Sequence, residues 1–209
     1  MIKKAFLLLS LLFPVSLMAQ LGVGSWQVYP TFQNVDKLLE TPDKVYCLSA
    51  GSLMSYDMDK NETYNYGVNN ILTEVGIKNI YYNPDGKYLL VVYNSAGMDV
   101  IYDNGKMISL PDIKDAIMNT VSVINDVAFA PGKIIVATNF GLVIYDDKKM
   151  EVKQTGNYGR NITVVGATDQ YIAAYNAQDK VMWLIKMGDK INNTDKFITL
   201  ADGIFSNKA

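Results

Sequence analysis

The sequence predicts an all-β chain organised as a β-propeller of about four blades, each with four antiparallel strands. The segment 124–146 reads as three consecutive strands separated by tight turns. Its Val, Ile, Phe and Tyr residues favour strands, while its Pro-Gly and Asn-x-Gly breaks favour turns. An apolar-Tyr-Asp ending to such a unit recurs about every 45 residues. That period, with four short strands per unit, is typical of a propeller.

The repeat divides each copy into strands in the same way. The apolar-Tyr-Asp ending marks the register at 55–57, 101–103 and 144–146, with a weaker fourth copy at 182–186. The expected strands are 35–39, 44–48, 52–56 and 62–66; 77–82, 87–93, 98–102 and 106–110; 124–129, 134–138, 142–145 and 150–155; and 162–167, 170–175, 180–185 and 197–200. Second strands such as 88–93 are apolar on both faces, which suits a strand between two neighbouring blades.

Four blades are the lower limit of the usual range, and a blade buries its faces only against its neighbours. The segment 25–29 is predicted to be a lone outer strand, of the kind that closes the last blade of a ring. The tail 201–207 resembles the linker 70–74 that opens the second blade. We therefore expect the N-terminal part of a larger, incomplete ring. The alternative is a complete four-bladed ring.

The N-terminus is predicted to be a cleaved secretory signal peptide, residues 1–19. It has a positive start at Lys3 and Lys4, an apolar run over 5–17 and a small residue at Ala19. The alternative is a retained membrane anchor. The mature chain, 20–209, is expected to hold the propeller blades and no transmembrane span, and to lie in the periplasm or at the cell surface in association with the outer membrane.

The composition excludes several function classes. The chain has no histidine, which removes Ser-His and Cys-His nucleophiles and imidazole metal sites. No cofactor is expected. The formal net charge is −2 with both signs scattered, so nucleic acid is not an expected partner. The single Cys47 is predicted to be buried as a small hydrophobic side chain.

A segment of the first copy matches a calcium-binding loop only in part. Asp57, Asp59 and Asn61 place oxygens at the first, third and fifth positions of such a loop. However, Glu62 stands where a glycine is needed, and Val68 stands where a bidentate glutamate is needed. The segment is therefore expected to be a polar hairpin turn, and no metal site is predicted.

Acidic residues could form catalytic pairs, but sequence spacing across blades does not fix their separation. A glycosidase needs two carboxylates at a defined distance. The candidates are Glu74, Asp99, Asp112, Asp115 and Asp126. Because any propeller with this many acids offers such pairs by chance, we do not expect an enzyme.

The candidate ligand-binding residues lie in the loops of one face. In a propeller, the turns between second and third strands share a face with the linkers between blades. These turns begin with Asn94, Asn139 and Asn176 in three copies, and Arg160 lies in the third linker. The amides could face a polar ligand such as a sugar, and Arg160 could hold a carboxylate or phosphate. The structural alternatives are that asparagine tolerates left-handed turn angles and that Arg160 is a solvated loop residue.

Several of these segments resemble the repeat of two-component-regulator propellers. They are 70–74, 77–80, 85–87, 100–103 and, most closely, 141–146. The chain departs from that pattern in two second strands, where 90–92 and 135–137 replace an expected Trp-x-Gly. The opening 23–30, directly behind the predicted signal peptide, is similar to the start of PorZ-type proteins of Bacteroidetes.

The resemblance implies an exported binding and scaffold protein that is not an enzyme. PorZ-type proteins carry two propellers and a small C-terminal domain. They act at the cell surface in the attachment complex of the type IX secretion system, beside the PorU sortase and anionic lipopolysaccharide. The resemblance thus implies secretion-system proteins or a surface glycan as partners. The open blade edges add the expectation of self-association.

Two other hypotheses remain open from the sequence. One is the periplasmic sensor propeller of a hybrid two-component system that binds an oligosaccharide. The other is an exported propeller enzyme such as a lyase or glycosidase.

Overall fold

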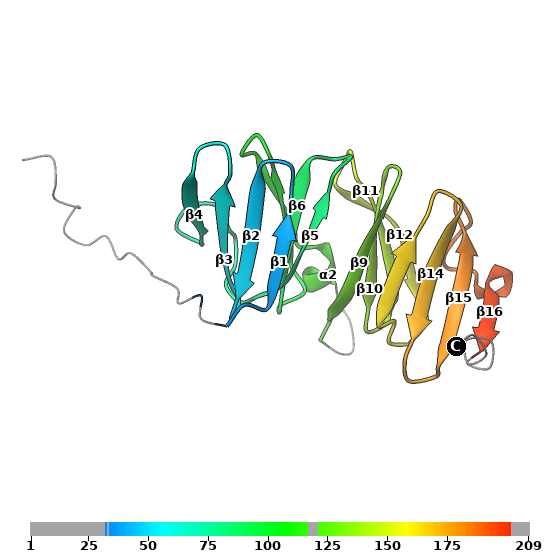
Figure 1. The fold of residues 1–209 in the computed structure, drawn as a ribbon. Helices are drawn as coiled ribbons and strands as arrows, with labels where there is room; N and C mark the ends of the chain where they lie inside the picture. Colours follow the sequence, from blue (N-terminus) through cyan, green and yellow to red (C-terminus); the bar gives the residue numbers. More distant parts are fainter. Residues whose placement is uncertain (1–31, 33, 117–120, 202–209) are drawn as a thin grey trace, which may run out of the picture. The chain divides into compact units, whose positions relative to one another are not determined.

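The computed structural model describes residues 32, 34–116 and 121–201 (Figure 1). The predicted signal peptide, the predicted strand 25–29 and almost all of the tail 201–207 lie outside the described residues.

The described residues form sixteen strands in four antiparallel sheets, each with its strands in chain order. The first sheet holds β1 (Lys37–Glu40), β2 (Lys44–Ser49), β3 (Ser52–Asp57) and β4 (Glu62–Tyr66). The second holds β5 (Ile77–Asn83), β6 (Tyr88–Tyr93), β7 (Met98–Tyr102) and β8 (Met107–Leu110). The third holds β9 (Ile124–Ala130), β10 (Lys133–Thr138), β11 (Gly141–Asp146) and β12 (Glu151–Asn157). The fourth holds β13 (Val164–Ala167), β14 (Tyr171–Asn176), β15 (Val181–Lys186) and β16 (Ile198–Ala201). The prediction of four four-stranded blades is confirmed.

The core consists of three apolar clusters, each between two neighbouring sheets. They include Leu53 with Leu89 between the first and second sheets, and Leu90 with Ile134 between the second and third. The third joins residues of the third and fourth sheets. Among the described residues, no cluster joins the first sheet to the fourth. The four sheets are therefore part of a propeller and do not form a closed ring.

Strand β6 shows why its sequence is apolar throughout. All six of its residues are buried. Leu89 and Val91 belong to the cluster toward the first sheet, whereas Leu90 and Val92 belong to the cluster toward the third. Side chains alternate between the two faces of a strand, so each face meets a different neighbour. Each fully buried Leu or Val contributes roughly 1.5–3 kcal/mol.

The apolar-Tyr-Asp mark keeps its cross-strand partners through the repeat but changes the face that it occupies. Its tyrosine pairs with Tyr88 in the second sheet and with Ile134 in the third. Its aspartate meets the lysine at or directly before the start of the preceding strand: Asp103 N–H donates to the Lys87 carbonyl (3.1 Å), and Asp146 pairs with Lys133. Tyr102 and Tyr145 both lie in the cluster between these two sheets, so the mark faces the following sheet in the second copy and the preceding sheet in the third.

Two short helices were not predicted. The single turn α2 (Asp112–Asp115) lies in the linker before β9 and buries Ile113 in the cluster between the second and third sheets. The 3-10 helix η2 (Thr194–Lys196) precedes β16, and the Asn193 side chain caps it by accepting from the Asp195 amide. One turn is too short to give a helical repeat of apolar residues. No helix of the described chain is long and apolar enough to cross a membrane.

Candidate functional site

The loops fall on two opposite faces, which we call the linker face and the turn face. The linker face holds the blade-to-blade linkers with the turns that follow β2, β6, β10 and β14. Backbone hydrogen bonds tie them together, as in Ile77 N–H to Gly51 carbonyl (3.1 Å) and Asn94 N–H to Gly76 carbonyl (3.0 Å). The turn face holds the remaining turns. The predicted sharing of one face by these turns and linkers is confirmed.

The three predicted asparagines all lie on the linker face. None of them has a positive φ, so the explanation from left-handed turn angles is wrong at these positions. The Asn139 amide instead binds its own linker: its Nδ2 donates to the Val121 carbonyl (2.9 Å), and its Oδ1 accepts from the Val123 amide (2.9 Å). Asn94 is exposed, and its backbone N–H donates to Gly76 in the first linker.

Asn176 and Arg160 converge on one carboxylate. The buried Asn176 donates from Nδ2 to Asp179 Oδ2 (2.9 Å), and its Oδ1 accepts from the amides of Gln178 and Asp179. Arg160, which is exposed, forms an ion pair with the same Asp179 oxygen. These contacts bring two of the four predicted site residues together. They also occupy both residues with groups of this chain.

Two acids that could have been catalytic hold the blades in place. Asp99 is fully buried and accepts from the Thr73 amide (2.8 Å), the Thr73 hydroxyl (2.8 Å) and the Tyr93 hydroxyl (2.5 Å). Burial raises the pKa of Tyr93, and the Asp99 carboxylate raises it further.

Asp126 of β9 joins three sheets. It accepts from the Tyr81 hydroxyl of the second sheet (3.1 Å) and from the Val165 amide of the fourth (3.0 Å). A carboxylate that satisfies such donors removes the cost of leaving them unpaired in the interior.

Glu74 of the linker face and Asp57 of the turn face also have partners within the chain. Glu74 forms an ion pair with Lys114 of α2 (3.1 Å). The segment after Asp57 is a hairpin turn, as predicted, in which the Lys60 amide donates to Asp57 (3.0 Å). Within the described ranges, no group of three or more acidic or cysteine side chains could hold a metal ion. Cys47 is buried, as predicted.

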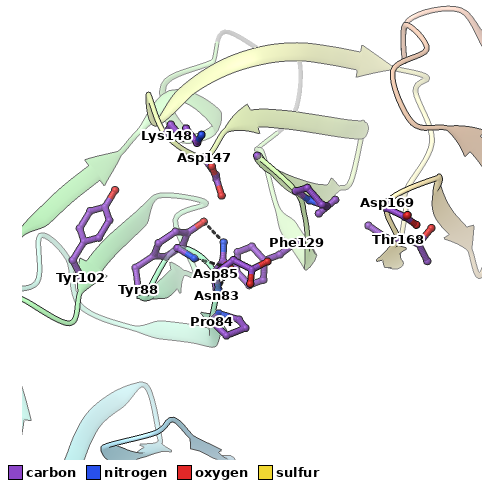
Figure 2. Close-up of a pocket in the computed structure, with 15 residues that line it drawn as sticks. Asn83, Pro84, Asp85, Tyr88, Tyr102, Phe129, Asp147, Lys148, Thr168 and Asp169 are labelled. Carbon is purple, nitrogen blue, oxygen red and sulfur yellow. Dashed lines mark hydrogen bonds between the residues drawn. The ribbon is translucent and has the colours of Figure 1, made fainter.

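The turn face holds a cavity of about 850 Å³ that sequence reasoning did not find (Figure 2). The turns of the second, third and fourth sheets line it. Its lining includes Asn83, Asp85, Tyr88, Tyr102, Phe129, Asp147, Lys148, Thr168 and Asp169. None of the four predicted site residues is among its lining residues.

One wall of the cavity is aromatic. The Tyr88 ring packs edge-on against Tyr102 (centroids 5.6 Å apart) and against Phe129 (5.9 Å). Asn83 fixes Tyr88 by donating from Nδ2 to its hydroxyl (2.9 Å), and its Oδ1 accepts from the amides of Asp85 and Gly86 in the same turn. A Cβ at Gly86 would lie 2.2 Å from the Tyr88 ring, so only glycine leaves room for it.

The charged groups of the cavity have no partners within the part of the chain that the structure describes. Asp85, Asp147 and Asp169 supply three carboxylates, and Lys148 supplies one ammonium; none of these side chains forms a hydrogen bond or ion pair there. In Figure 2, Asp147 points toward the space between the tyrosines and Phe129. Burial raises the pKa of Tyr102, and the nearby Asp147 carboxylate adds to that rise.

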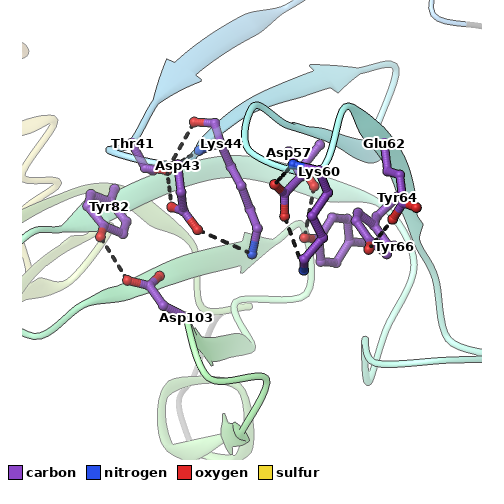
Figure 3. A network of polar contacts seen from close by, with 11 residues as sticks. Thr41, Asp43, Lys44, Asp57, Lys60, Glu62, Tyr64, Tyr66, Tyr82 and Asp103 are labelled. Atoms are coloured by element: carbon purple, nitrogen blue, oxygen red, sulfur yellow. Dashed lines mark hydrogen bonds and ion pairs between the residues drawn. The ribbon is translucent and has the colours of Figure 1, made fainter.

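Elsewhere on the same face, polar groups of the first sheet, and Tyr82 and Asp103 of the second, bind one another (Figure 3). Lys44 pairs with Asp43 (3.9 Å). Lys60 pairs with Asp57 (3.4 Å). Tyr82 donates to Asp103 (3.1 Å), and burial together with this hydrogen bond raises its pKa to about 12. Paired charges therefore occupy part of the turn face, whereas the four charged side chains that line the cavity have no such partners in the described chain.

The cavity is equipped for binding. It offers the partly exposed rings of Tyr102 and Phe129 and an excess of negative charge. The sequence signal that could have revealed it is the presence of aromatic or Asp residues at the turns of successive copies: Asp85 and Tyr88 in 83–88, Phe129 in 129–132 and Asp147 in 147–148. The recurring asparagines instead predicted a site on the linker face.

Comparison with known proteins supports a specific family. A family model described as "TSS9, PorZ, N-terminal beta-propeller domain" matches residues 45–197. Curated protein sequences give no significant match. The solved structure of PorZ from Porphyromonas gingivalis matches with a TM-score of 0.72 and 22% identity. The match covers 80% of this chain and 22% of that one, so the chain spans about a fifth of the length of PorZ.

Other propellers show the same fold at lower similarity. The extracellular domain of the putative one component system BT4673 from B. thetaiotaomicron matches with a TM-score of 0.50 and 17% identity, over 73% of this chain and 19% of that one. The WD40 repeats of RRP9 match with a TM-score of 0.60 and 8% identity, over 80% and 51%. At these identities the likeness establishes the fold. The family model matches well over half of the chain, and the chain therefore belongs to the family of PorZ N-terminal β-propeller domains of the type IX secretion system.

Proposed function

We propose that this chain is an exported, non-enzymatic binding and scaffold module that works at the cell surface in the attachment complex of type IX secretion. The observation that carries the proposal is the turn-face cavity, whose aromatic and charged groups are left available for a partner. The acids Asp99 and Asp126 are engaged in holding the blades, which argues against a catalytic pair there.

The family supports the location. The PorZ of Porphyromonas gingivalis is described as an essential bacterial surface component of the type IX secretion system. We extend that location to this chain, with export by the predicted signal peptide of residues 1–19 and with association with the outer membrane. Its partners are other secretion-system proteins, with a surface glycan such as anionic lipopolysaccharide as a further ligand.

The test is deletion of the gene in its source bacterium. We expect the type IX cargo proteins to disappear from the medium and to return when the intact gene is restored. Protease added to whole cells should cleave the restored protein. Unchanged cargo secretion, or protection of the protein inside the cell, would overturn the proposal.

A second candidate is the sensor propeller of a hybrid two-component system. The likeness to the extracellular domain of BT4673 favours it. In that case a deletion would leave cargo secretion intact and would abolish a transcriptional response to one oligosaccharide. The two candidates therefore separate in the same strain.

We also propose that the chain self-associates through the outer faces of its first and fourth sheets. Leu38 is 65% exposed on the first, and Val164 and Ile198 are 53% and 52% exposed on the fourth. Cross-strand pairing extends the fourth-sheet patch to Tyr175 and Met182. Such faces are stable only when another blade covers them. Light scattering after size-exclusion chromatography should show oligomers, and Ile198→Lys should reduce them. A monodisperse monomer would contradict this proposal.

A further inference from the structure

We infer that the turn-face cavity binds a cationic side chain of a partner protein, with arginine preferred over lysine. The inference rests on the proposed binding function and names the chemistry of the partner. It concerns the face opposite to the one that carries Asn94, Asn139, Asn176 and Arg160.

The negative charge of the cavity lining favours a cationic ligand. The cavity wall has three carboxylates against one ammonium, and neither kind is neutralised within the described part of the chain. A cation that enters gains attraction without breaking an existing ion pair. An anionic ligand would meet Asp85, Asp147 and Asp169 and would be repelled.

The aromatic wall of the cavity favours arginine over lysine. A cation within about 6 Å of a ring face is attracted by the ring quadrupole. Phe129 and Tyr102 lie on either side of Tyr88, and Asp147 points toward the space beside them. A planar guanidinium can stack on a ring while its fork donates two hydrogen bonds to one carboxylate. The compact ammonium of lysine cannot do both.

The aromatic wall is held in a fixed position, which favours binding. The Asn83–Tyr88 hydrogen bond holds the Tyr88 ring in place before any ligand arrives. Gly86, which has no side chain, leaves the space that this ring occupies. A prearranged wall lowers the cost of ordering on binding.

The size of the cavity favours a protein segment. Its volume of about 850 Å³ lies near the upper end of typical ligand pockets, and turns of three sheets surround it. One arginine side chain would fill only part of it. The remaining space can take the backbone on both sides of that residue.

The test uses the full-length protein and labelled peptides of three arginines, three lysines or three glutamates, measured by fluorescence anisotropy at low salt. We expect the arginine peptide to bind best and the glutamate peptide not to bind. Asp147→Asn should weaken arginine binding about tenfold, since it removes a charge-assisted hydrogen bond. The matched control Asp59→Asn removes an exposed carboxylate outside the cavity and should change affinity less than about twofold.

A second variant keeps the test valid if one substitution disturbs folding. Phe129→Leu preserves an apolar side chain and removes the ring, and it should weaken arginine binding more than lysine binding. Equal binding of the arginine and glutamate peptides would overturn the inference. So would full affinity in the double variant Asp147→Asn/Asp169→Asn, or stronger binding of purified anionic lipopolysaccharide that this double variant weakens.

The two proposals fail in different ways. If deletion abolishes cargo secretion but the arginine peptide does not bind, the binding module stands and the cationic partner is wrong. If the peptide binds through Asp147 but deletion leaves cargo secretion unchanged, the secretion role is wrong.

Discussion

The linker face and the turn-face cavity use acidic residues in opposite ways. On the linker side, Asp99, Asp126 and Asp179 all accept hydrogen bonds or ion pairs from the chain itself. Around the cavity, Asp147 and Asp169 have no such partner among the described residues. Buried polar groups that are satisfied stabilise a fold, whereas unsatisfied surface charges remain available for a ligand. The difference separates the acids that hold the blades from those that can recognise a partner.

The largest expected effect is alkaline unfolding, which tests whether the blade-holding phenols stay protonated. Burial and acidic neighbours raise the pKa of Tyr93 and bring that of Tyr82 to about 12. An unfolded tyrosine ionises near pH 10. The folded state therefore holds its protons more tightly, and its stability falls as pH rises above about 10. Circular dichroism and phenolate absorbance should change together. Ionisation of all tyrosines near pH 10 with the structure intact would contradict this.

Next in size is the contrast between Asp99→Ala and Asp147→Asn. Loss of the Asp99 carboxylate leaves the Tyr93 hydroxyl and the Thr73 amide without their acceptor in the interior. We expect the free energy of unfolding to fall by about 3 kcal/mol. Asp147→Asn should change it by less than about 0.5 kcal/mol, because that carboxylate has no partner in the described chain. Urea unfolding measures both, and equal effects would remove the distinction between the two faces.

A smaller effect sharpens the role of Asp126 as a tie between sheets. Tyr81→Phe and Asp126→Asn should each cost about 1 to 2 kcal/mol. The double variant should cost less than the sum, because both substitutions act on the same hydrogen bond between Tyr81 and residue 126. Additive costs in urea unfolding would show that the two residues act independently.

The smallest effect is expected at Arg160. Its ion pair with Asp179 is exposed, and such pairs contribute about 0 to 1 kcal/mol. Arg160→Ala should lower the free energy of unfolding by about 0.5 kcal/mol or less and should leave arginine-peptide binding unchanged. A loss of peptide binding would place the binding site on the linker face instead.

The fold could be predicted from the sequence because each strand carries its own local signal. The sixteen expected strands agree with the observed ones to within about two residues, since Pro-Gly and Asn-Gly turns mark their ends. The neighbouring sheet that each Tyr-Asp mark faces could not be predicted from the sequence. The second sheet closes its β5–β6 turn between Asn83 and Tyr88, whereas the third closes the equivalent turn between Ala130 and Lys133. The longer turn accompanies a Tyr-Asp mark that faces the following sheet instead of the preceding one.

The site could not be predicted for a related reason. Tyr88, Tyr102 and Phe129 come from two different sheets, and only the packing of these sheets brings the rings together. The asparagines stood out because they recur at one position of the repeat. Recurrence at a turn reflects what the turn needs, as the bonds of Asn139 and Asn176 to their own loops illustrate.

Because the core consists of three separate clusters, the order in which the sheets unfold locally should depend on their position along the chain. The second and third sheets are each covered on both sides, while the described contacts cover the first and fourth on one side only. Stability in such a linear array adds up from neighbour to neighbour. Amide protons of β6 and β10 should therefore exchange with solvent last, and those of β2 and β14 earlier. The cavity lies over the turns of the slow-exchanging centre, so a partner docked there would meet the most persistent part of the protein.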